Sequence, residues 1–214
     1  MSTILDGVSV NGEEGSANGG AASAGGPLAL FPLNTVLFPG GPLALRIFEP
    51  RYMDMVSRCM RESRPFGVVL IREGLEAGPI VQIAPIGTSA RIVDFTSLPD
   101  GLLGLSCVGE QTFRVLNHWT ARDGLNWGEV EFLPGEEPQP VPEQHRVLEQ
   151  ALRRVLSEIP ELYAGVQPRY EDASWVSYRL AEIIPLPLPE RLELLTLTDP
   201  VERLTRIAAA LPRR

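Results

Sequence analysis

The sequence predicts an α+β protein in which a β-barrel with one embedded helix is followed by a C-terminal helical bundle. Three observations carry this prediction. Residues 27–135 contain apolar runs of strand length separated by Pro- and Gly-rich turns. Residues 134–142 contain four prolines, which exclude regular secondary structure. After this segment the apolar spacing changes from a period of two to about 3.6, which is typical of amphipathic helices.

The first 26 residues are predicted to form a disordered tail. Seven of them are glycine, and alanine and serine contribute four each. Such a composition buries too little apolar surface to offset the entropy lost on ordering. The segment lacks the basic start and the long apolar run of a secretory signal. The expected boundaries are therefore a tail over 1–26, a barrel subdomain over 27–135 and a bundle subdomain over 136–214.

The β-rich part is expected to begin with two strands and a helix. The strands are predicted at Leu28–Leu33 and Leu43–Phe48, and the turn Phe38–Pro42 separates them because Pro and Gly supply fixed or positive φ. A helix should follow from Pro50 to about Arg64, since proline suits the first helical position. The expected apolar stripe of this helix consists of Tyr52, Val56, Cys59 and Met60.

Further strands are expected around this helix, and turn signals at Leu98–Gly101 and Asp123–Gly124 separate some of them. Several short strands with one helix indicate a closed or partly closed barrel, which also protects strand edges from aggregation. The strands are predicted at Phe66–Ile71, Ile83–Phe95, Leu102–Val108, Thr112–Thr120 and Trp127–Leu133.

Four helices are expected in the last part of the chain. The second spans roughly Ser174–Ile184, and a third starts near Pro189. The last opens at Asp199, an N-cap residue followed by a proline and by Glu202 at capping-box spacing. The first carries an apolar stripe at helical spacing, made by Leu148, Leu152, Val155, Ile159 and Leu162.

Composition excludes several classes of function. The formal net charge is −8, and no segment has the basic excess that nucleic-acid binding requires. All 19 basic residues are arginine, so any mechanism that needs a lysine is excluded. No run of 18 apolar residues occurs, so no membrane span is expected. Cys59 and Cys107 are expected to be reduced thiols in a cytoplasmic protein, with a disulfide as the alternative.

Four groups of residues resemble, in the right order, the Lon protease N-terminal domain family. Phe31-Pro-Leu-(x)3-Leu-Phe-Pro-Gly-Gly-x-Leu-x-Leu45 resembles its first strands. Ile47-Phe-Glu-Pro-Arg-Tyr-Met53 resembles the helix entry of stand-alone bacterial members and, more distantly, of cereblon-like proteins. Residues 86–115 resemble its central hairpin, and residues 180–204 its helical half. The resemblance implies a PUA-like β-barrel followed by a helical bundle.

The resemblance also implies a module that binds protein or unfolded peptide segments. Lon proteases add an ATPase with a P-loop lysine and a protease with a Ser-Lys dyad, which a lysine-free chain cannot form. We therefore expect a non-catalytic protein with no cofactor. One alternative is an RNA-binding module, because PUA-like barrels bind RNA elsewhere, although the acidic charge opposes it. Another is an uncharacterised hydrolase, although no nucleophile–base pair is visible.

Candidate partner-binding residues lie at the strand-to-helix corner, where an arginine supplies a planar donor and a tyrosine an amphipathic platform. The alternative is that Glu49 caps the helix and pairs with an arginine while Tyr52 fills the core, and we expect Arg51 to follow this structural interpretation. The candidates are Arg46, Glu49, Arg51 and Tyr52.

No catalytic or metal site is expected. His118 and His145 have no ligands at matching spacing, and Cys107 lies in an apolar strand that does not favour a thiolate. Aromatic residues concentrate in the β-rich part, and those left exposed would form a groove of the kind that protein partners use. They are Phe95, Phe113, Trp119, Trp127 and Phe132.

Overall fold

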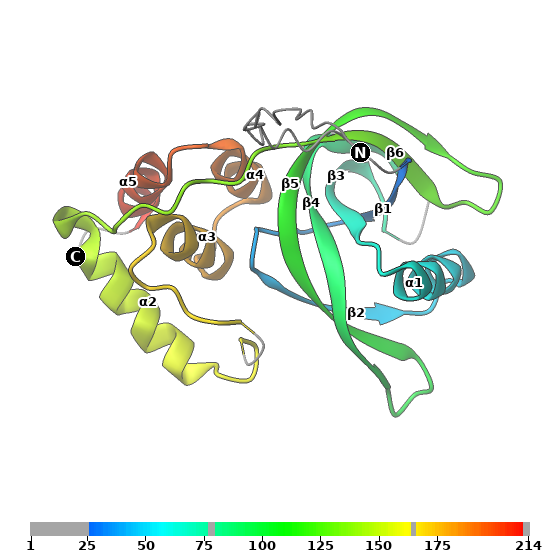
Figure 1. Cartoon of the computed structure of the whole chain (residues 1–214), viewed down its shortest axis with the longest axis horizontal. Coiled ribbons are helices and arrows are strands. Elements are labelled where there is room, and N and C mark those ends of the chain that lie inside the picture. The colour runs from blue at the N-terminus through cyan, green and yellow to red at the C-terminus, as the bar shows by residue number, and fades with distance from the viewer. Residues whose placement is uncertain (1–25, 77–79, 164–165, 212–214) are drawn as a thin grey trace, which may run out of the picture.

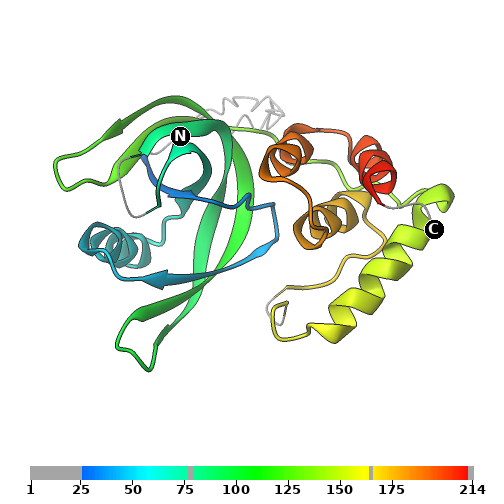
Figure 2. The ribbon, with the colours of Figure 1, turned by 180° about the vertical axis from the view of Figure 1, so that it is seen from behind.

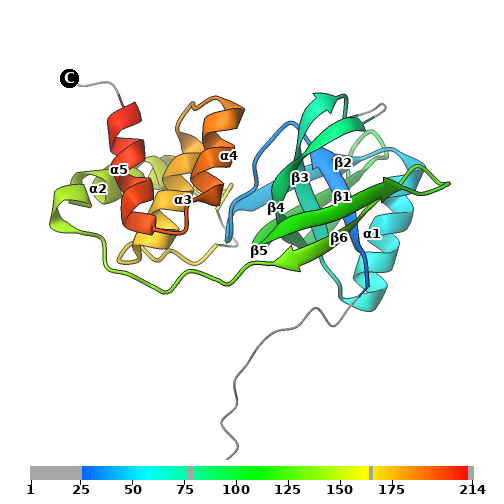
Figure 3. The same cartoon turned by 90° about the horizontal axis from the view of Figure 1, so that it is seen from above.

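The computed structural model describes residues 26–76, 80–163 and 166–211 (Figure 1). It has an α+β fold in which a mixed β-sheet with one helix lies beside a group of helices (Figures 1 and 3). The predicted tail over 1–26 falls, apart from its last residue, outside the described residues. None of the described helices is long and apolar enough to cross a membrane.

Six strands form the sheet in the order β2-β5-β4-β3-β1-β6, and β5 also pairs with β6. Strands β1 and β3 are parallel, and the other pairs are antiparallel. The hydrogen bonding therefore passes from β5 through β4, β3, β1 and β6 back to β5. The strands are β1 (Leu28–Leu33), β2 (Pro42–Ile47), β3 (Phe66–Gly74), β4 (Ile80–Ser97), β5 (Leu103–Thr120) and β6 (Asn126–Phe132).

Strand β5 runs without interruption where the sequence predicted two strands, Leu102–Val108 and Thr112–Thr120. Gly109 lies between these two predicted strands, and it allows a close approach of the chain. Its N–H donates to the carbonyl oxygen of Gly41 (2.9 Å), and its own carbonyl accepts from the N–H of Gly40 (2.7 Å). A Cβ at this position would collide with the carbonyl oxygen of Phe38, so only glycine fits.

Helix α1 (Pro50–Glu62) packs one face against the sheet. The predicted stripe is confirmed at Tyr52, Val56 and Cys59, which are buried, and is wrong at Met60, which is 42% exposed. Met55 is buried in its place, because residues three and four apart share a helix face. The helix ends when Ser63 adopts a left-handed conformation with φ of 50°.

The second half of the chain contains α2 (Arg146–Glu158), α3 (Ala173–Ile183), α4 (Leu188–Thr196) and α5 (Pro200–Ala210), after a short 3-10 turn at Glu143–His145. Helix α2 ends at Glu158, because Pro160 disfavours helical geometry at Ile159. The predicted stripe residue Leu162 therefore lies outside the helix and is exposed. Asp199 caps α5 as predicted, and its carboxylate accepts from the N–H groups of Val201 and Glu202. Glu202 does not complete a capping box, since its side chain bonds Arg206.

The turn between β1 and β2 joins the sheet to the helices, and it points towards α3 in Figure 2. Phe38 is fully buried, with its ring 5.6 Å from that of Tyr178. Arg179 donates to the carbonyl oxygen of Pro39 (2.9 Å). A Cβ on Gly41 would collide with the carboxylate of Glu182. The paired glycines of this turn therefore allow close contact with α3.

The Pro-rich segment between β6 and α2 carries half of a buried ion pair. Arg203 on α5 is 0% exposed and pairs with Glu136, whose carboxylate also accepts from Ser174 Oγ and the Tyr178 hydroxyl. Arg203 Nε donates to the carbonyl oxygen of Leu194 (2.9 Å). These hydrogen bonds link the Pro-rich segment to α3 and α5 through Glu136, and Arg203 extends them to α4.

Candidate functional site

Three of the four residues at the strand-to-helix corner pack against one another. Glu49 lies at the N-cap position of α1 without bonding a helix N–H, and its carboxylate pairs with Arg51 (2.7 Å). Arg51 Nη1 donates to the carbonyl oxygen of Gly124 (2.8 Å), and its guanidinium lies 4.7 Å from the ring centre of Tyr52. Tyr52 is 3% exposed and stacks on Phe31 at 3.9 Å. Burial raises the pKa of the Tyr52 hydroxyl to about 12.

Arg46 lies apart from these three residues. Its side chain is 65% exposed and pairs with Asp100, in the turn between β4 and β5. Together with Leu98 and Pro99 the pair borders a groove of about 610 Å³ over β2 and β5. The groove is also lined by Ala44, Leu45, Thr96, Gly104, Leu105 and Ser106.

We expect Arg51→Ala to lower the free energy of unfolding by about 1–2 kcal/mol, because it removes charged hydrogen bonds from a largely enclosed position. Chemical unfolding in urea measures this change. Arg61→Ala is the matched control, since Arg61 is 74% exposed on the same helix. An unchanged urea midpoint for Arg51→Ala would contradict the structural role of this side chain.

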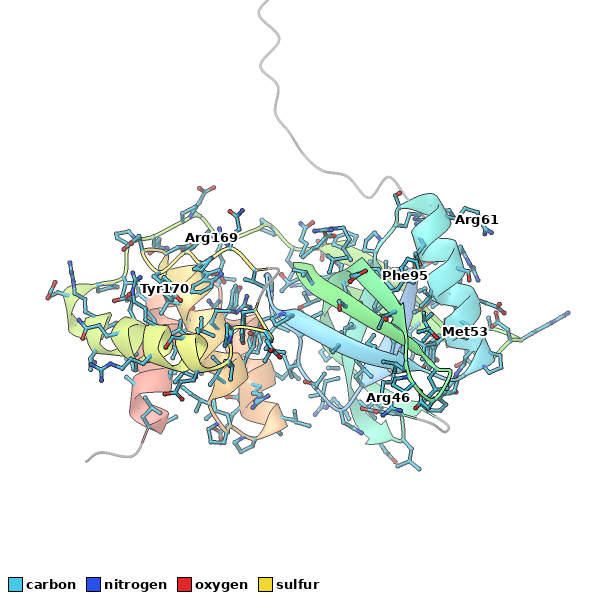
Figure 4. The ribbon with its side chains drawn as sticks, turned by 90° about the horizontal axis from the view of Figure 1, so that it is seen from below. Arg46, Met53, Arg61, Phe95, Arg169 and Tyr170 are labelled. Atoms are coloured by element: carbon cyan, nitrogen blue, oxygen red, sulfur yellow. The ribbon has the colours of Figure 1, made fainter. Side chains whose placement is uncertain are left out.

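A second surface, the α1–β4 groove, lies between the end of α1 and strand β4, with a volume of about 300 Å³. It presents apolar side chains to solvent: Met60 is 42%, Val93 45% and Phe95 55% exposed. Figure 4 shows Phe95 on the side of the sheet that carries α1, with Met53 and Arg61 along that helix. The groove is lined by Cys59, Met60, Ser63, Arg64, Arg91, Ile92, Val93, Asp94 and Phe95.

One wall of the α1–β4 groove is an edge of strand β4. Pairing of β4 with β3 reaches Ala90, opposite Phe66, and goes no further. From Arg91 to Ser97, β4 pairs only with β5, so its other edge has no strand partner among the described residues. The Phe95 N–H is satisfied locally by the Asp94 carboxylate (2.8 Å). Such an edge can accept an additional extended chain.

Two arginines, Arg64 and Arg91, line the groove together with one carboxylate, Asp94. Arg91 pairs with Glu110 (2.6 Å), and Arg64 lies 3.8 Å from Glu62, but both arginines are about half exposed. Arg61 is more exposed still. An extended chain with acidic residues beside its apolar ones would therefore match this surface.

The remaining chemical candidates do not converge. His118 is exposed on β5, whereas His145 is buried and its Nε2 lies 3.1 Å from Thr205 Oγ1. Within the described ranges, no three His, Cys, Asp or Glu side chains gather as metal ligands. Cys59 and Cys107 are both free and buried, as predicted for reduced thiols. Burial raises the pKa of the Cys107 thiol to about 12, which opposes a nucleophilic role.

Sequence reasoning anticipated an aromatic surface only in part. Phe95 on β4 is exposed and Phe113 on β5 is fully buried, a distinction that alternation along two 18-residue strands with register shifts between them could not supply. The exposure of Met60 was missed because it was assigned to the buried face of α1. One signal was available: Met60 follows Cys59 directly, and adjacent helical residues diverge by about 100°.

A family model described as the ATP-dependent protease La (LON) substrate-binding domain matches residues 27–213. The chain is 26% identical to a Lon protease of Phenylobacterium zucineum (strain HLK1), over 96% of this chain and 26% of that protease. It therefore spans about a quarter of that relative's length. Protein cereblon of Xenopus tropicalis is 27% identical over 64% of this chain and 30% of cereblon.

Among solved structures, the crystal structure of the Lon N-terminal domain protein from Xanthomonas campestris is similar to this chain. It aligns with a TM-score of 0.73 at 37% identity and covers 87% of this chain and 99% of its own. The likeness thus includes both the sheet and the helices.

Proposed function

This chain belongs to the family of the ATP-dependent protease La (LON) substrate-binding domain, and from that premise we propose that it is a non-enzymatic module that binds polypeptide segments in extended form. The observation that carries the proposal is the β4 edge over Arg91–Ser97, which has no strand partner among residues 26–76, 80–163 and 166–211 and lies beside exposed Met60, Val93 and Phe95. Backbone hydrogen bonds at a strand edge give affinity without a fixed sequence, which suits a module for unfolded segments.

The proposal includes a rigid scaffold for this surface. The ring of pairings from β5 back to β5 supports a PUA-like barrel over 27–135, and the packing of Phe38 against Tyr178 supports a bundle over 136–214 that moves with it. A rigid scaffold limits the entropy that the binding edge loses when a partner docks. Free buried thiols support a reducing, cytoplasmic setting.

The strand-to-helix corner has a different part in this proposal. Binding through Arg46, Glu49, Arg51 and Tyr52 stays a prediction. Arg51 and Tyr52 would act by holding the start of α1, since their side chains face Gly124 and Phe31. Arg46 is the member with an exposed side chain and could contact a partner directly. Nucleic acid is disfavoured as that partner by the net charge of −8.

The test is binding of a fluorescent, reduced and carboxymethylated unfolded protein, followed by anisotropy at low salt. We expect Phe95→Asp, alone or with Met60→Asp, to weaken binding at least tenfold, because a charge in the groove opposes apolar contact. Both side chains are exposed, so the urea midpoint should hardly change.

Val147→Asp is the matched control, since Val147 is 67% exposed on α2, in the other half of the molecule. It should bind like the unmodified protein. Equal affinities for Phe95→Asp and Val147→Asp would place the binding surface elsewhere. Absence of saturable binding by the unmodified protein would reject the proposed function.

A further inference from the structure

We propose that residues 3–10 of this chain occupy the α1–β4 groove when no partner is bound, so that the chain's own N-terminal segment competes with its partners. This inference rests on the proposed function, since it concerns the same groove. Residues 3–10 read Thr-Ile-Leu-Asp-Gly-Val-Ser-Val and are the one apolar run within the first 26 residues. Ile4, Val8 and Val10 are β-branched, and they fall on one face of an extended chain.

The place where the described chain begins supports this occupant. Pro27 and Leu28 line a small cavity together with Cys59 and Arg64. Cys59 and Arg64 also line the α1–β4 groove. The chain therefore enters the fold directly beside the groove, on the other side of the last turn of α1.

The intervening chain is long enough to reach any point of the groove. Residues 11–25 are mostly Gly, Ala and Ser, and the expected root-mean-square span for fifteen residues of such a composition is roughly 20 Å. The free edge over Arg91–Ser97 is about 23 Å long at strand spacing. Residues 3–10 match that length, so one segment can pair with the whole edge.

Charge and side-chain chemistry agree with this assignment. The N-terminal segment has Asp6, Glu13 and Glu14 and no basic residue. The groove is lined by two half-exposed arginines, Arg64 and Arg91, and by one carboxylate, Asp94, which accepts from the Phe95 N–H. Apolar Ile4 and Val8 would meet the exposed cluster of Met60, Val93 and Phe95.

Tethering makes even a weak contact effective. A short flexible linker gives an effective concentration in roughly the millimolar range. If the segment alone binds with a dissociation constant of about 0.1–1 mM, it weakens an external competitor by about two- to tenfold. This range sets the size of effect that the experiment must resolve.

The first measurement is amide hydrogen exchange, followed by mass spectrometry, on the full 214-residue chain. We expect Ile4→Asp/Val8→Asp to speed exchange across residues 91–97 by about two- to tenfold, the same factor as for the competitor, because free edge amides exchange faster than paired ones. The matched control is Ala17→Asp/Ala22→Asp, which adds the same charge within the same N-terminal 26 residues. Equal exchange in all three proteins would overturn the inference.

The second measurement is affinity for the carboxymethylated unfolded protein. Ile4→Asp/Val8→Asp should bind it about two- to tenfold more tightly than the control does. If exchange changes but nothing binds, the segment docks and the proposed function fails. If Phe95→Asp abolishes binding while the segment variants leave both exchange and affinity unchanged, the proposed function stands and this inference fails.

Discussion

Arg203→Met is expected to lower the free energy of unfolding by about 3–5 kcal/mol, the usual loss when one partner of a buried ion pair is removed. The guanidinium is 0% exposed and contacts Glu136, Ser177 and the Leu194 carbonyl oxygen. Methionine fills part of the volume but leaves the Glu136 carboxylate without its cation. Urea unfolding monitored by tryptophan fluorescence measures the change.

Two further variants test the reason for this loss. Arg206→Met lies on the same helix, where the arginine is 50% exposed and pairs with Glu202, so it should change stability by less than about 1 kcal/mol. Adding Glu136→Gln to Arg203→Met should recover part of the loss, because no uncompensated charge then remains buried. If Arg203→Met and Arg206→Met are equally stable, the network does not hold the Pro-rich segment in solution.

The stability of the protein is expected to fall as pH rises from about 5 to 8, with Glu182 as the cause. Burial raises the pKa of this carboxyl from 4.5 to about 7, although Arg179, the Tyr163 hydroxyl and Arg191 all act in the opposite direction. A folded-state pKa above the unfolded one means that the folded protein holds the proton more tightly. The stabilisation is therefore complete below about pH 4.5 and is lost as pH rises through 7.

The expected size is about 3 kcal/mol across this range, at about 1.4 kcal/mol for each pKa unit. Glu182→Gln replaces the protonated carboxyl with a neutral amide, so its stability should be nearly independent of pH between 5 and 8. Glu202→Gln is the control and should retain the dependence, since Glu202 is 48% exposed. Parallel stability curves for Glu182→Gln and the unmodified protein would reject this role for Glu182.

Local patterns in the sequence were sufficient for most elements of the fold. Prolines, glycines and apolar spacing located β1, α1 and the capped start of α5, because each depends on neighbouring residues. They could not reveal that Arg203 pairs with Glu136, 67 positions away, or that Glu182 meets Gly41. Those contacts depend on how elements far apart in the sequence pack together. The spacing of apolar residues along the chain does not predict them.

The candidate site was predictable to a smaller extent for the same reason. The sequence drew attention to Arg51 and Tyr52, whose side chains are largely enclosed, and passed over Met60 and Val93, whose side chains are exposed. Whether a strand edge is open depends on where a neighbouring strand stops. That β3 stops pairing with β4 at Ala90 follows from the register of the whole sheet.

The buried position of Phe38 has a consequence for the order of events during synthesis. Its aromatic partner, Tyr178, emerges from the ribosome about 140 residues later, which takes roughly 7–28 s at usual elongation rates. Until then the nascent strands carry an apolar turn with nothing to cover it. We therefore expect translation that stalls between the two halves to yield an aggregation-prone fragment, and nascent chains of this protein to depend on chaperones during that interval.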